Sequence, residues 1–401
     1  MMNVCGIVAE YNPFHTGHAH HLAQTRRALG AETAIVCAMS GDFVQRGDLA
    51  ILEKYRRAEA AVRCGVDLVI ETPLSACLWA AEGFARGAVA LLDALGCLTH
   101  LSFGAEHADL GLLRRAADRT AATAPLRQAL QRGLPYAAAM QQAVSATDPA
   151  AGALLASPND TLAVEYLRAL TALDSAIEPL AIPRAGSAHD STAPVDGLPS
   201  ASYLRGLLRQ DALSACRPLM PPASFDVLDR AIRAGAAPVT SAAVDQAIVA
   251  HLRRLDPAAL LPFCGDDGLA HRLWTAIRDQ TSFAAIATAA QTRRYPLARV
   301  RRALLRAWLD LPNAVPVTAG YVRVLAIGAR GRAVLRLMKR TCALPVIVKP
   351  VTERALPDAL QPALALDARA DDLYALAQPD RALHVGGDHF RRSPFCLPDS
   401  V

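Results

Sequence analysis

Short apolar runs alternate with longer stretches of helical periodicity over the first half of the chain. The runs are rich in Val, Ile, Leu and Ala and end at polar turn residues, which is typical of buried strands. The expected strands cover residues 4–9, 34–39, 66–70, 98–103 and 177–182. Strands that alternate with helices in this way predict an α/β fold with a doubly wound, Rossmann-like parallel sheet and right-handed crossovers.

Two regions depart from this alternation. Residues 110–156 are rich in Ala, Leu and Arg and show no strand signal, so we expect a helical insertion there. After about residue 221 the pattern is mainly helical, with short apolar runs at 322–327 and 345–348 as candidates for further strands. The chain therefore divides into an expected α/β domain at 1–220 and a mainly helical region at 221–401.

Composition and charge indicate the general class of the protein but do not identify a binding partner. The 401 residues carry a formal net charge of +5 and nine cysteines, none of them in a C-x-x-C pair. Scattered cysteines of this kind indicate reduced thiols, not disulfides or a zinc site. The longest apolar region, 68–95, contains four charged residues, and no basic segment precedes a signal-length apolar run. We expect a cytoplasmic protein with no membrane span, and the sequence carries no signal for an oligomeric state.

The first polar loop carries the strongest candidate chemistry. Strand 4–9 is followed by a turn and by His15-Thr16-Gly17-His18 at the start of a helix. A helix N-terminus favours an anion, and two imidazoles supply donors where charge develops during phosphoryl or nucleotidyl transfer. Gly17 is expected to let the backbone approach a ligand closely. Two histidines around a glycine also occur by chance, so this motif alone leaves catalysis and an ordinary helix start both open.

Further polar loops follow the other expected strands. They lie after residue 39, after residue 103 and after residue 182, and the carboxyl ends of parallel strands meet at one edge of a sheet. The helix that begins at Ser200 offers hydroxyls, free N–H groups and Arg205 as a second anion-binding end. For Ser200 and Ser202, simple helix capping is the alternative interpretation. Ser157 and Asp160 are the expected caps of the helix that runs to residue 170.

The region 293–340 is strongly basic. It contains twelve Arg and Lys residues and a single acid, Asp310. This asymmetry is typical of a nucleic-acid surface, although a solvated helix face in an Arg-rich chain would look the same. Asp367, Asp371 and Asp372 show no metal-loop spacing and are expected at the surface.

Taken together, the motifs resemble those of the bacterial tRNA(Met) cytidine acetate ligases, members of the HIGH-type nucleotidyltransferase superfamily. The matching blocks are GIVAEYNPFHTGH at 6–18, MSGDFVQRG at 39–47, LSFGAE at 101–106 and SPN at 157–159. Residues 268–272, 292–295 and 321–325 also fit, so the resemblance covers most of the chain.

The resemblance implies a ligase that forms a carbon–nitrogen bond. Such an enzyme uses ATP to activate acetate as acetyl-adenylate and then acetylates N4 of the wobble cytidine of elongator tRNA(Met), with magnesium a possible companion of ATP. The implied catalytic residues are His15 and His18, and no metal ligands are assigned. The implied ATP-binding residues are Ile7, Val8, Ala9, Glu10, Tyr11, Asn12, Pro13, Phe14, His15, Thr16, Gly17, His18, Ala19, His20, Gly104, Asn159, Arg184, Ser200, Ser202 and Arg205. The expected tRNA-binding residues are Arg293, Arg294, Arg301, Arg302 and Arg323.

Three positions depart from the family pattern, and two other functions stay open. Pro183 stands where Lys is usual, Ala188 where Tyr is usual, and Asp42 where Asn is usual, so that a negative charge could oppose an anion. One alternative is a small-molecule nucleotidyltransferase, against which the basic C-terminal half argues. The other is a non-catalytic tRNA-binding protein with a vestigial ATP site, against which the intact histidine motif argues.

Overall fold

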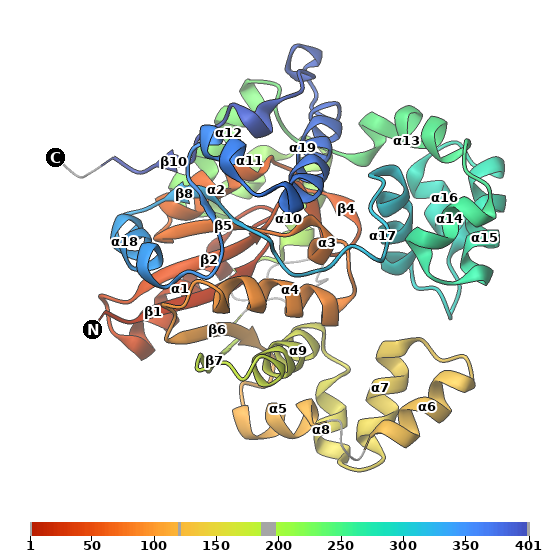
Figure 1. The fold of residues 1–401 in the computed structure, drawn as a ribbon, viewed down its shortest axis with the longest axis horizontal. Helices are drawn as coiled ribbons and strands as arrows, with labels where there is room; N and C mark the ends of the chain where they lie inside the picture. Colours follow the sequence, from red (N-terminus) through yellow and green to blue (C-terminus); the bar gives the residue numbers. More distant parts are fainter. Residues whose placement is uncertain (1, 119–121, 186–197, 399–401) are drawn as a thin grey trace.

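A mixed β-sheet forms the centre of the molecule (Figure 1). The computed structural model describes residues 2–118, 122–185 and 198–398 of the chain. The strand order is β10-β8-β5-β2-β1-β6-β7, with β9 paired to β8 and a separate β3–β4 hairpin. The strands are β1 (Val4–Ala9), β2 (Ala34–Ser40), β3 (Phe43–Val44), β4 (Asp48–Leu49), β5 (Leu68–Thr72), β6 (His100–Ala105), β7 (Glu178–Pro183), β8 (Val322–Ile327), β9 (Val346–Ile347) and β10 (Phe395–Cys396).

The expected parallel sheet is confirmed, and β8, β9 and β10 of the C-terminal region are added to it. β1 pairs in parallel with β2 and β6, β2 with β5, and β6 with β7. β8, which the apolar run at 322–327 indicated only as a candidate strand, joins the same sheet and runs antiparallel to β5. The sheet therefore contains strands that precede residue 220 and strands that follow it. The expected division into an α/β domain at 1–220 and a mainly helical region at 221–401 is wrong to this extent, because part of 221–401 belongs to the sheet.

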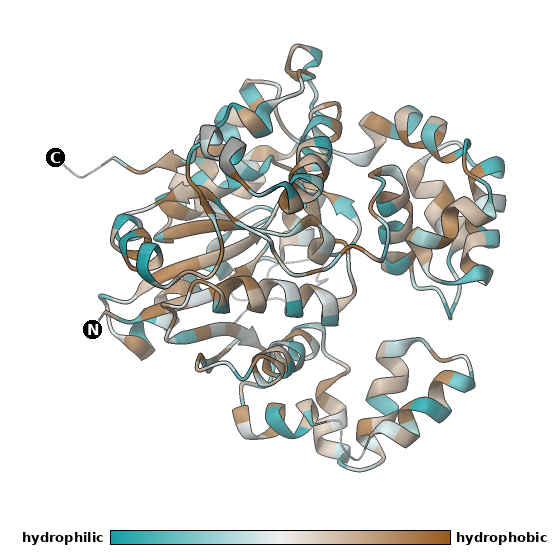
Figure 2. Ribbon diagram, viewed as in Figure 1, coloured by the Kyte–Doolittle hydropathy of each residue, from teal (hydrophilic) through white to brown (hydrophobic). Residues whose placement is uncertain are grey.

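Helices cover both faces of the sheet. Its strands are therefore buried on both sides, which explains why they are nearly continuous apolar runs in the sequence. All of β2 is buried, and the strands appear mainly brown in Figure 2. Val36 packs in the core that contains Val89 of α4 (Ala81–Asp93), on one face. Its neighbours Ile35 and Cys37 pack on the other face, with residues from α1 (Thr16–Leu29) and α2 (Lys54–Arg63). The alternation of side chains along β2 thus fills two cores.

The remaining helices include the expected insertion. That insertion contains α5 (Leu110–Ala117), α6 (Thr123–Gln131), α7 (Tyr136–Ser145) and α8 (Pro149–Leu154). The others are α3 (Leu74–Cys77), α9 (Pro158–Ala172), α10 (Ala201–Arg209), α11 (Leu213–Cys216), α12 (Pro222–Arg233), α13 (Asp245–Leu252), α14 (Pro257–Cys264), α15 (Asp267–Asp279), α16 (Phe283–Ala290), α17 (Leu297–Trp308), α18 (Gly331–Thr341) and α19 (Gln361–Ala375). Within the described part of the chain, none of these helices combines the length and apolar composition needed to span a bilayer.

The start of α2 is set by the β3–β4 hairpin. The helix begins at Lys54, because Asp48 and Leu49 pair with β3 and the carboxylate of Glu53 accepts from the Arg56 N–H as the cap. Two separate helices, α3 and α4, follow β5. The bundle α13–α17 has its own apolar core, which also buries Phe43 and Leu49 of the β3–β4 hairpin.

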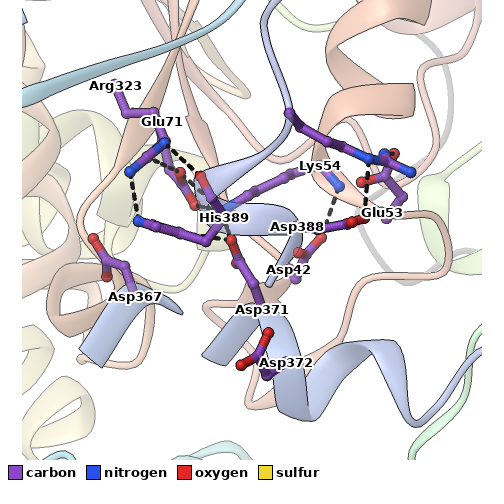
Figure 3. A network of polar contacts seen from close by, with 12 residues as sticks. Asp42, Glu53, Lys54, Glu71, Arg323, Asp367, Asp371, Asp372, Asp388 and His389 are labelled. Atoms are coloured by element: carbon purple, nitrogen blue, oxygen red, sulfur yellow. Dashed lines mark hydrogen bonds and ion pairs between the residues drawn. The ribbon is translucent and has the colours of Figure 1, made fainter. Parts of the chain in front are cut away.

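A buried ionic network joins the C-terminal segments to the sheet (Figure 3). The ammonium of Lys54, which is 1 % exposed, lies 2.8 Å from a carboxylate oxygen of Glu71 and 2.7 Å from one of Asp371. The imidazole of His389 also contacts Asp371, at 2.9 Å. These contacts connect α2, β5, α19 and the short 3-10 turn at 388–390, so opposite charges compensate one another inside the fold.

This network corrects three sequence-based expectations. Arg323 is 3 % exposed and its guanidinium lies 2.8 Å from a carboxylate oxygen of Glu353, so it does not belong to an exposed RNA surface. Asp371 is buried against Lys54, and Asp367 accepts a hydrogen bond from the Tyr321 hydroxyl, so neither is a simple surface acid. Charged side chains are buried only when they are paired, and these partners are too distant in sequence to be recognised.

Candidate active site

A pocket opens at the carboxyl ends of β1, β6 and β7, beside the N-termini of α1 and α10. This is the edge at which open α/β sheets bind ligands. Most of the expected ATP-binding residues line it together. They are Ile7, Val8, Ala9, Glu10, Tyr11, Asn12, His15, Gly17, His18, His20, Gly104, Asn159, Arg184, Ser200, Ser202 and Arg205.

Four expected residues of the first motif do not line this pocket: Pro13, Phe14, Thr16 and Ala19. Phe14 is 1 % exposed, and its ring packs against those of Tyr11 and His18. The Thr16 hydroxyl donates to the carbonyl of Leu219, 3.1 Å away. These residues build the turn and the start of α1, so their role in the motif is to support the site.

The two histidines of the motif form the cap of α1. The Gly17 N–H donates to Nδ1 of His15 at 3.1 Å, and the His15 N–H donates to Nδ1 of His18 at 3.2 Å. The rings lie 3.8 Å apart between centroids. A neutral imidazole has one acceptor and one donor nitrogen, so acceptance at Nδ1 places the proton on Nε2. The helix cap therefore leaves one Nε2–H donor on each ring.

The electrostatic environment keeps both rings neutral. Burial, followed by the positive charges of Arg184 and Arg205, lowers the pKa of His15 to about 3. Burial, and then the neighbouring His15 ring, holds the pKa of His18 well below its ordinary value. At pH 7 the pair therefore acts through hydrogen-bond donation and not through cationic charge.

Gly17 meets a steric requirement in addition to the one expected. A Cβ at this position would lie 2.9 Å from Cε1 and 3.1 Å from Nδ1 of His15. Contacts this short would displace the ring that caps the helix. The absence of a side chain at Gly17 thus leaves room for the His15 ring. Gly17 also lines the pocket, and the close approach of a ligand to its backbone stays a prediction.

Two arginines flank the histidines. Arg205 donates from Nη1 to the carbonyl of Asn12 at 2.8 Å and from Nη2 to Oγ of Ser202 at 3.0 Å. Ser200 accepts from the Tyr203 N–H at 3.0 Å, so its capping interpretation holds. Arg184 lies at the end of β7 and lines the same pocket. Two guanidinium groups beside a helix N-terminus are a suitable environment for phosphate oxygens.

Glu106 places Asn159 in the pocket. Its carboxylate accepts from the Asn159 amide and from the Asp160 N–H, the latter at 3.0 Å. Asp160 does not cap its own helix, because its side chain contacts Nδ1 of His107 at 2.7 Å. Ser157 occupies the N-cap position without a side-chain cap bond. The carboxylates of Glu106 and Asp160 thus join the end of β6 to the start of α9 at the edge of the pocket.

Several pocket residues were missed from the sequence. His21 lines the pocket, and its Nε2 lies 2.9 Å from Oγ of Ser102 on β6. The i, i+3 spacing of His18 and His21 places them on the same side of a helix, a signal that could have identified His21. The other missed lining residues are Gln45, Arg46, Phe84, Phe103, Leu162, Tyr166, Ile182, Pro183, Ala185, Pro199 and Ala201.

Of the three departures from the family pattern, Asp42 does not line the pocket. It is 5 % exposed and accepts from the Lys54 N–H at 2.7 Å. Burial raises the pKa of its carboxyl group well above its ordinary value, which weakens the expectation that a negative charge here opposes an anion. Pro183 lines the pocket, and Ala188 lies outside the described residues.

The expected tRNA-binding arginines occupy different environments. Arg293 and Arg294 are exposed, and Arg294 lies 3.2 Å from Asp266. Arg301 and Arg302 are half-buried, and Nη1 of Arg302 donates to the carbonyl of Gln45 at 2.9 Å. That contact joins α17 to the rim of the pocket. Arg323 belongs to the buried network instead.

Comparisons with known proteins agree with this geometry. The profile of the HIGH Nucleotidyl Transferase family matches residues 2–386. A tRNA(Met) cytidine acetate ligase of Alkaliphilus metalliredigens is 30 % identical over 98 % of this chain and 99 % of its own length. A tRNA(Met) cytidine acetate ligase of Syntrophotalea carbinolica is 37 % identical over 86 % of this chain and 84 % of its own length.

Solved structures extend the likeness to three dimensions. The apo crystal structure of Thermotoga maritima TmcAL superposes with a TM-score of 0.93 at 28 % identity, covering 99 % of this chain and all of that one. The T. maritima TmcAL structure with bound alpha-thio ATP has a TM-score of 0.91 at 29 % identity and the same coverage. With its histidine-capped helix and its end-to-end match to these relatives, the chain belongs to the HIGH nucleotidyl transferases, in the tRNA(Met) cytidine acetate ligase family.

Proposed function

We propose that the protein uses ATP to convert acetate into acetyl-adenylate and transfers the acetyl group to N4 of the wobble cytidine of elongator tRNA(Met). The observation that carries this proposal is the pair of neutral imidazoles at the start of α1, each with Nε2–H as its donor, beside Arg184 and Arg205. Relatives that match the chain over nearly its whole length are named tRNA(Met) cytidine acetate ligases, which supports the proposal.

The first step needs charge compensation and no general base. Acetate is ionised at pH 7, so its oxygen can attack the α-phosphorus of ATP directly while the bond to pyrophosphate breaks. Both reactants are anions, and their repulsion is the main barrier to contact. His15 and His18 donate to phosphate oxygens on which charge develops, and Arg184 and Arg205 hold the leaving pyrophosphate.

The second step depends on position. The exocyclic amine of cytidine attacks the acetyl carbonyl of the mixed anhydride, AMP leaves, and the amine loses a proton. The adenylate is already activated, so the enzyme contributes mainly by holding the amine against the carbonyl. The exposed Arg293 and Arg294, with Arg301 and Arg302 nearer the pocket, supply positive charge for the tRNA backbone.

Within the described residues, no group of three or more His, Cys, Asp or Glu side chains could hold a metal ion. Magnesium would arrive with the triphosphate, and no step here is assigned to it. Because tRNA is used in the cytoplasm, the proposed substrate implies a cytoplasmic enzyme.

The test is a comparison of carboxylic acids and RNA in one assay series. We expect acetate-dependent ATP–pyrophosphate exchange, and transfer of labelled acetate into elongator tRNA(Met) but not into a tRNA with uridine at the wobble position. Exchange with a phosphorylated metabolite and no transfer to RNA would indicate a small-molecule nucleotidyltransferase. RNA binding without exchange under any condition would indicate a non-catalytic tRNA-binding protein.

A further inference from the structure

A second cavity lies beside the ATP pocket, between the helical insertion and the C-terminal bundle. Its volume is about 490 Å³, within the range of ligand sites in proteins. Figure 1 shows α6–α7 and α13–α17 projecting on the same side of the sheet. The walls come from α7, from the α3–α4 turn, and from α14 and α17; the residues used below are Trp79, Tyr136, Met140, Phe263, Arg299 and Arg302.

The cavity and the ATP pocket share structural walls. Gln45 lines the ATP pocket, its amide donates to the Trp79 carbonyl at 3.3 Å, and its own carbonyl accepts from Arg302. Helix α9 lines both spaces as well: Leu162 and Tyr166 face the ATP pocket, while Thr161 and Glu165 line the second cavity. A ligand that occupies the cavity is therefore next to whatever reacts in the pocket.

The lining combines aromatic surface with positive charge. Tyr136 is 40 % exposed, an unusual exposure for a large ring, and Met140 and Phe263 extend the apolar wall. Across from them, Arg299 and Arg302 lie one turn apart on α17. Stacking rings next to guanidinium groups form the environment that binds the bases and phosphates of unpaired nucleic acid.

The positive charge is only partly compensated. Arg299 lies 3.7 Å from Asp266, which Arg294 also contacts. Among the described residues, neither Arg302 nor Arg306 has a carboxylate within 4 Å, and both donate to main-chain carbonyls. The cavity also contains Glu82 and Glu165, of which Glu165 pairs with Arg168 at 2.6 Å. Cations therefore predominate on the α17 side.

From this juxtaposition we infer that the cavity is an RNA subsite: it holds an unpaired nucleotide next to the acetylated cytidine, with the base on Tyr136 and its phosphate at Arg299 and Arg302. The inference rests on the proposed function, which supplies the RNA. It adds that the helical insertion takes part in RNA recognition together with the basic bundle.

The experiment uses the full-length enzyme and an elongator tRNA(Met) anticodon stem-loop with 2-aminopurine beside the wobble cytidine. Stacking on an aromatic ring quenches this base, and one stacked base contributes a factor of roughly 5 to 150 in affinity. We expect quenching on binding to the wild type and to Tyr136→Phe. Tyr136→Ala should lose the quenching and raise Kd and the KM for RNA about tenfold. Arg299→Ala should raise Kd and flatten its salt dependence.

The outcomes separate this inference from the proposed function. Arg233→Ala, an exposed arginine on α12, is the matched control and should behave as wild type. If the wild type acetylates RNA but Tyr136→Ala and Arg299→Ala bind and quench the stem-loop normally, the inference is wrong. If free CMP or AMP binds the cavity and these variants change only that binding, it is a mononucleotide site and the inference is equally wrong. Failure of the wild type to acetylate any RNA would instead overturn the proposed function.

Discussion

The double role of His18 predicts that two conservative substitutions have opposite effects. Its Nδ1 accepts from the His15 N–H and caps α1, while its Nε2–H is left for the ligand. In His18→Asn, the side-chain oxygen lies near the former Nδ1 position and keeps the acceptor, but no donor reaches the Nε2 position. In His18→Gln, the amide nitrogen reaches the Nε2 position, but the cap acceptor is lost.

The expected magnitudes follow from the two interactions. Loss of one donor to developing charge lowers turnover by about two to three powers of ten. Loss of a helix cap costs about 0.5–2 kcal/mol of unfolding free energy. We therefore expect His18→Asn to lose at least 100-fold in acetate-dependent pyrophosphate exchange with nearly native stability. His18→Gln should retain more exchange than His18→Asn and unfold at lower urea concentration.

The assays are pyrophosphate exchange at saturating acetate and urea unfolding at pH 7.5. His271, which is 65 % exposed on α15, provides the control, because His271→Asn and His271→Gln should leave both measurements unchanged. If His18→Asn were as active as wild type, the donor role of Nε2 would be wrong. If His18→Gln were the more stable but less active variant, the assignment of the two nitrogens would be reversed.

Three further predictions concern pH, burial and RNA. Because the pKa of His15 is about 3 in the folded protein and about 6.5 when unfolded, only the unfolded state gains a proton between pH 7 and pH 5. Urea unfolding should thus show about 2 kcal/mol less stability at pH 5 from this group, and His15→Asn should reduce that loss; equal pH dependence would contradict it. Lys54→Met removes the cation that two buried carboxylates share and, among the described residues, leaves Glu71 only Arg323 and Asp371 only His389 as partners, so it should cost about 3 kcal/mol in urea unfolding, against less than about 1 for exposed Arg233→Met; similar costs would contradict the network's role. Replacing Arg293 and Arg294 with Ala should weaken tRNA binding and lower its salt slope by one to two with exchange unchanged; a parallel loss of exchange would refute the separation of tasks.

The parts of the fold that could be predicted are those set by local pattern. Strand β1 was predicted with its observed bounds, because a parallel strand covered on both faces is apolar at every position. The start of α1 was recognised from His15 and His18. The steric requirement for a glycine at position 17 was not predicted, because it depends on where the His15 ring lies and not on the spacing of residues.

The parts that could not be predicted depend on contacts between distant segments. Strand β8 lies more than 250 residues after β5, and nothing local indicates that the two pair or that they run antiparallel. Arg323 was assigned to the RNA surface because an arginine in a basic region is usually solvated. Its burial becomes understandable only when Glu71 and Glu353 are placed around it.

The same distant contacts determine how the two chemical steps can be combined. The β3–β4 hairpin carries Gln45 and Arg46 at the ATP pocket, while Phe43 and Leu49 on either side are buried in the core of the bundle. The hairpin therefore couples the bundle to the rim of the ATP pocket. If, as proposed, activated acetate is held at the sheet and the RNA by the bundle and the insertion, transfer requires these parts to keep a fixed separation. The contacts that would hold this separation are the hairpin and the buried network, which ties α19 and the 3-10 turn at 388–390 to α2 and β5.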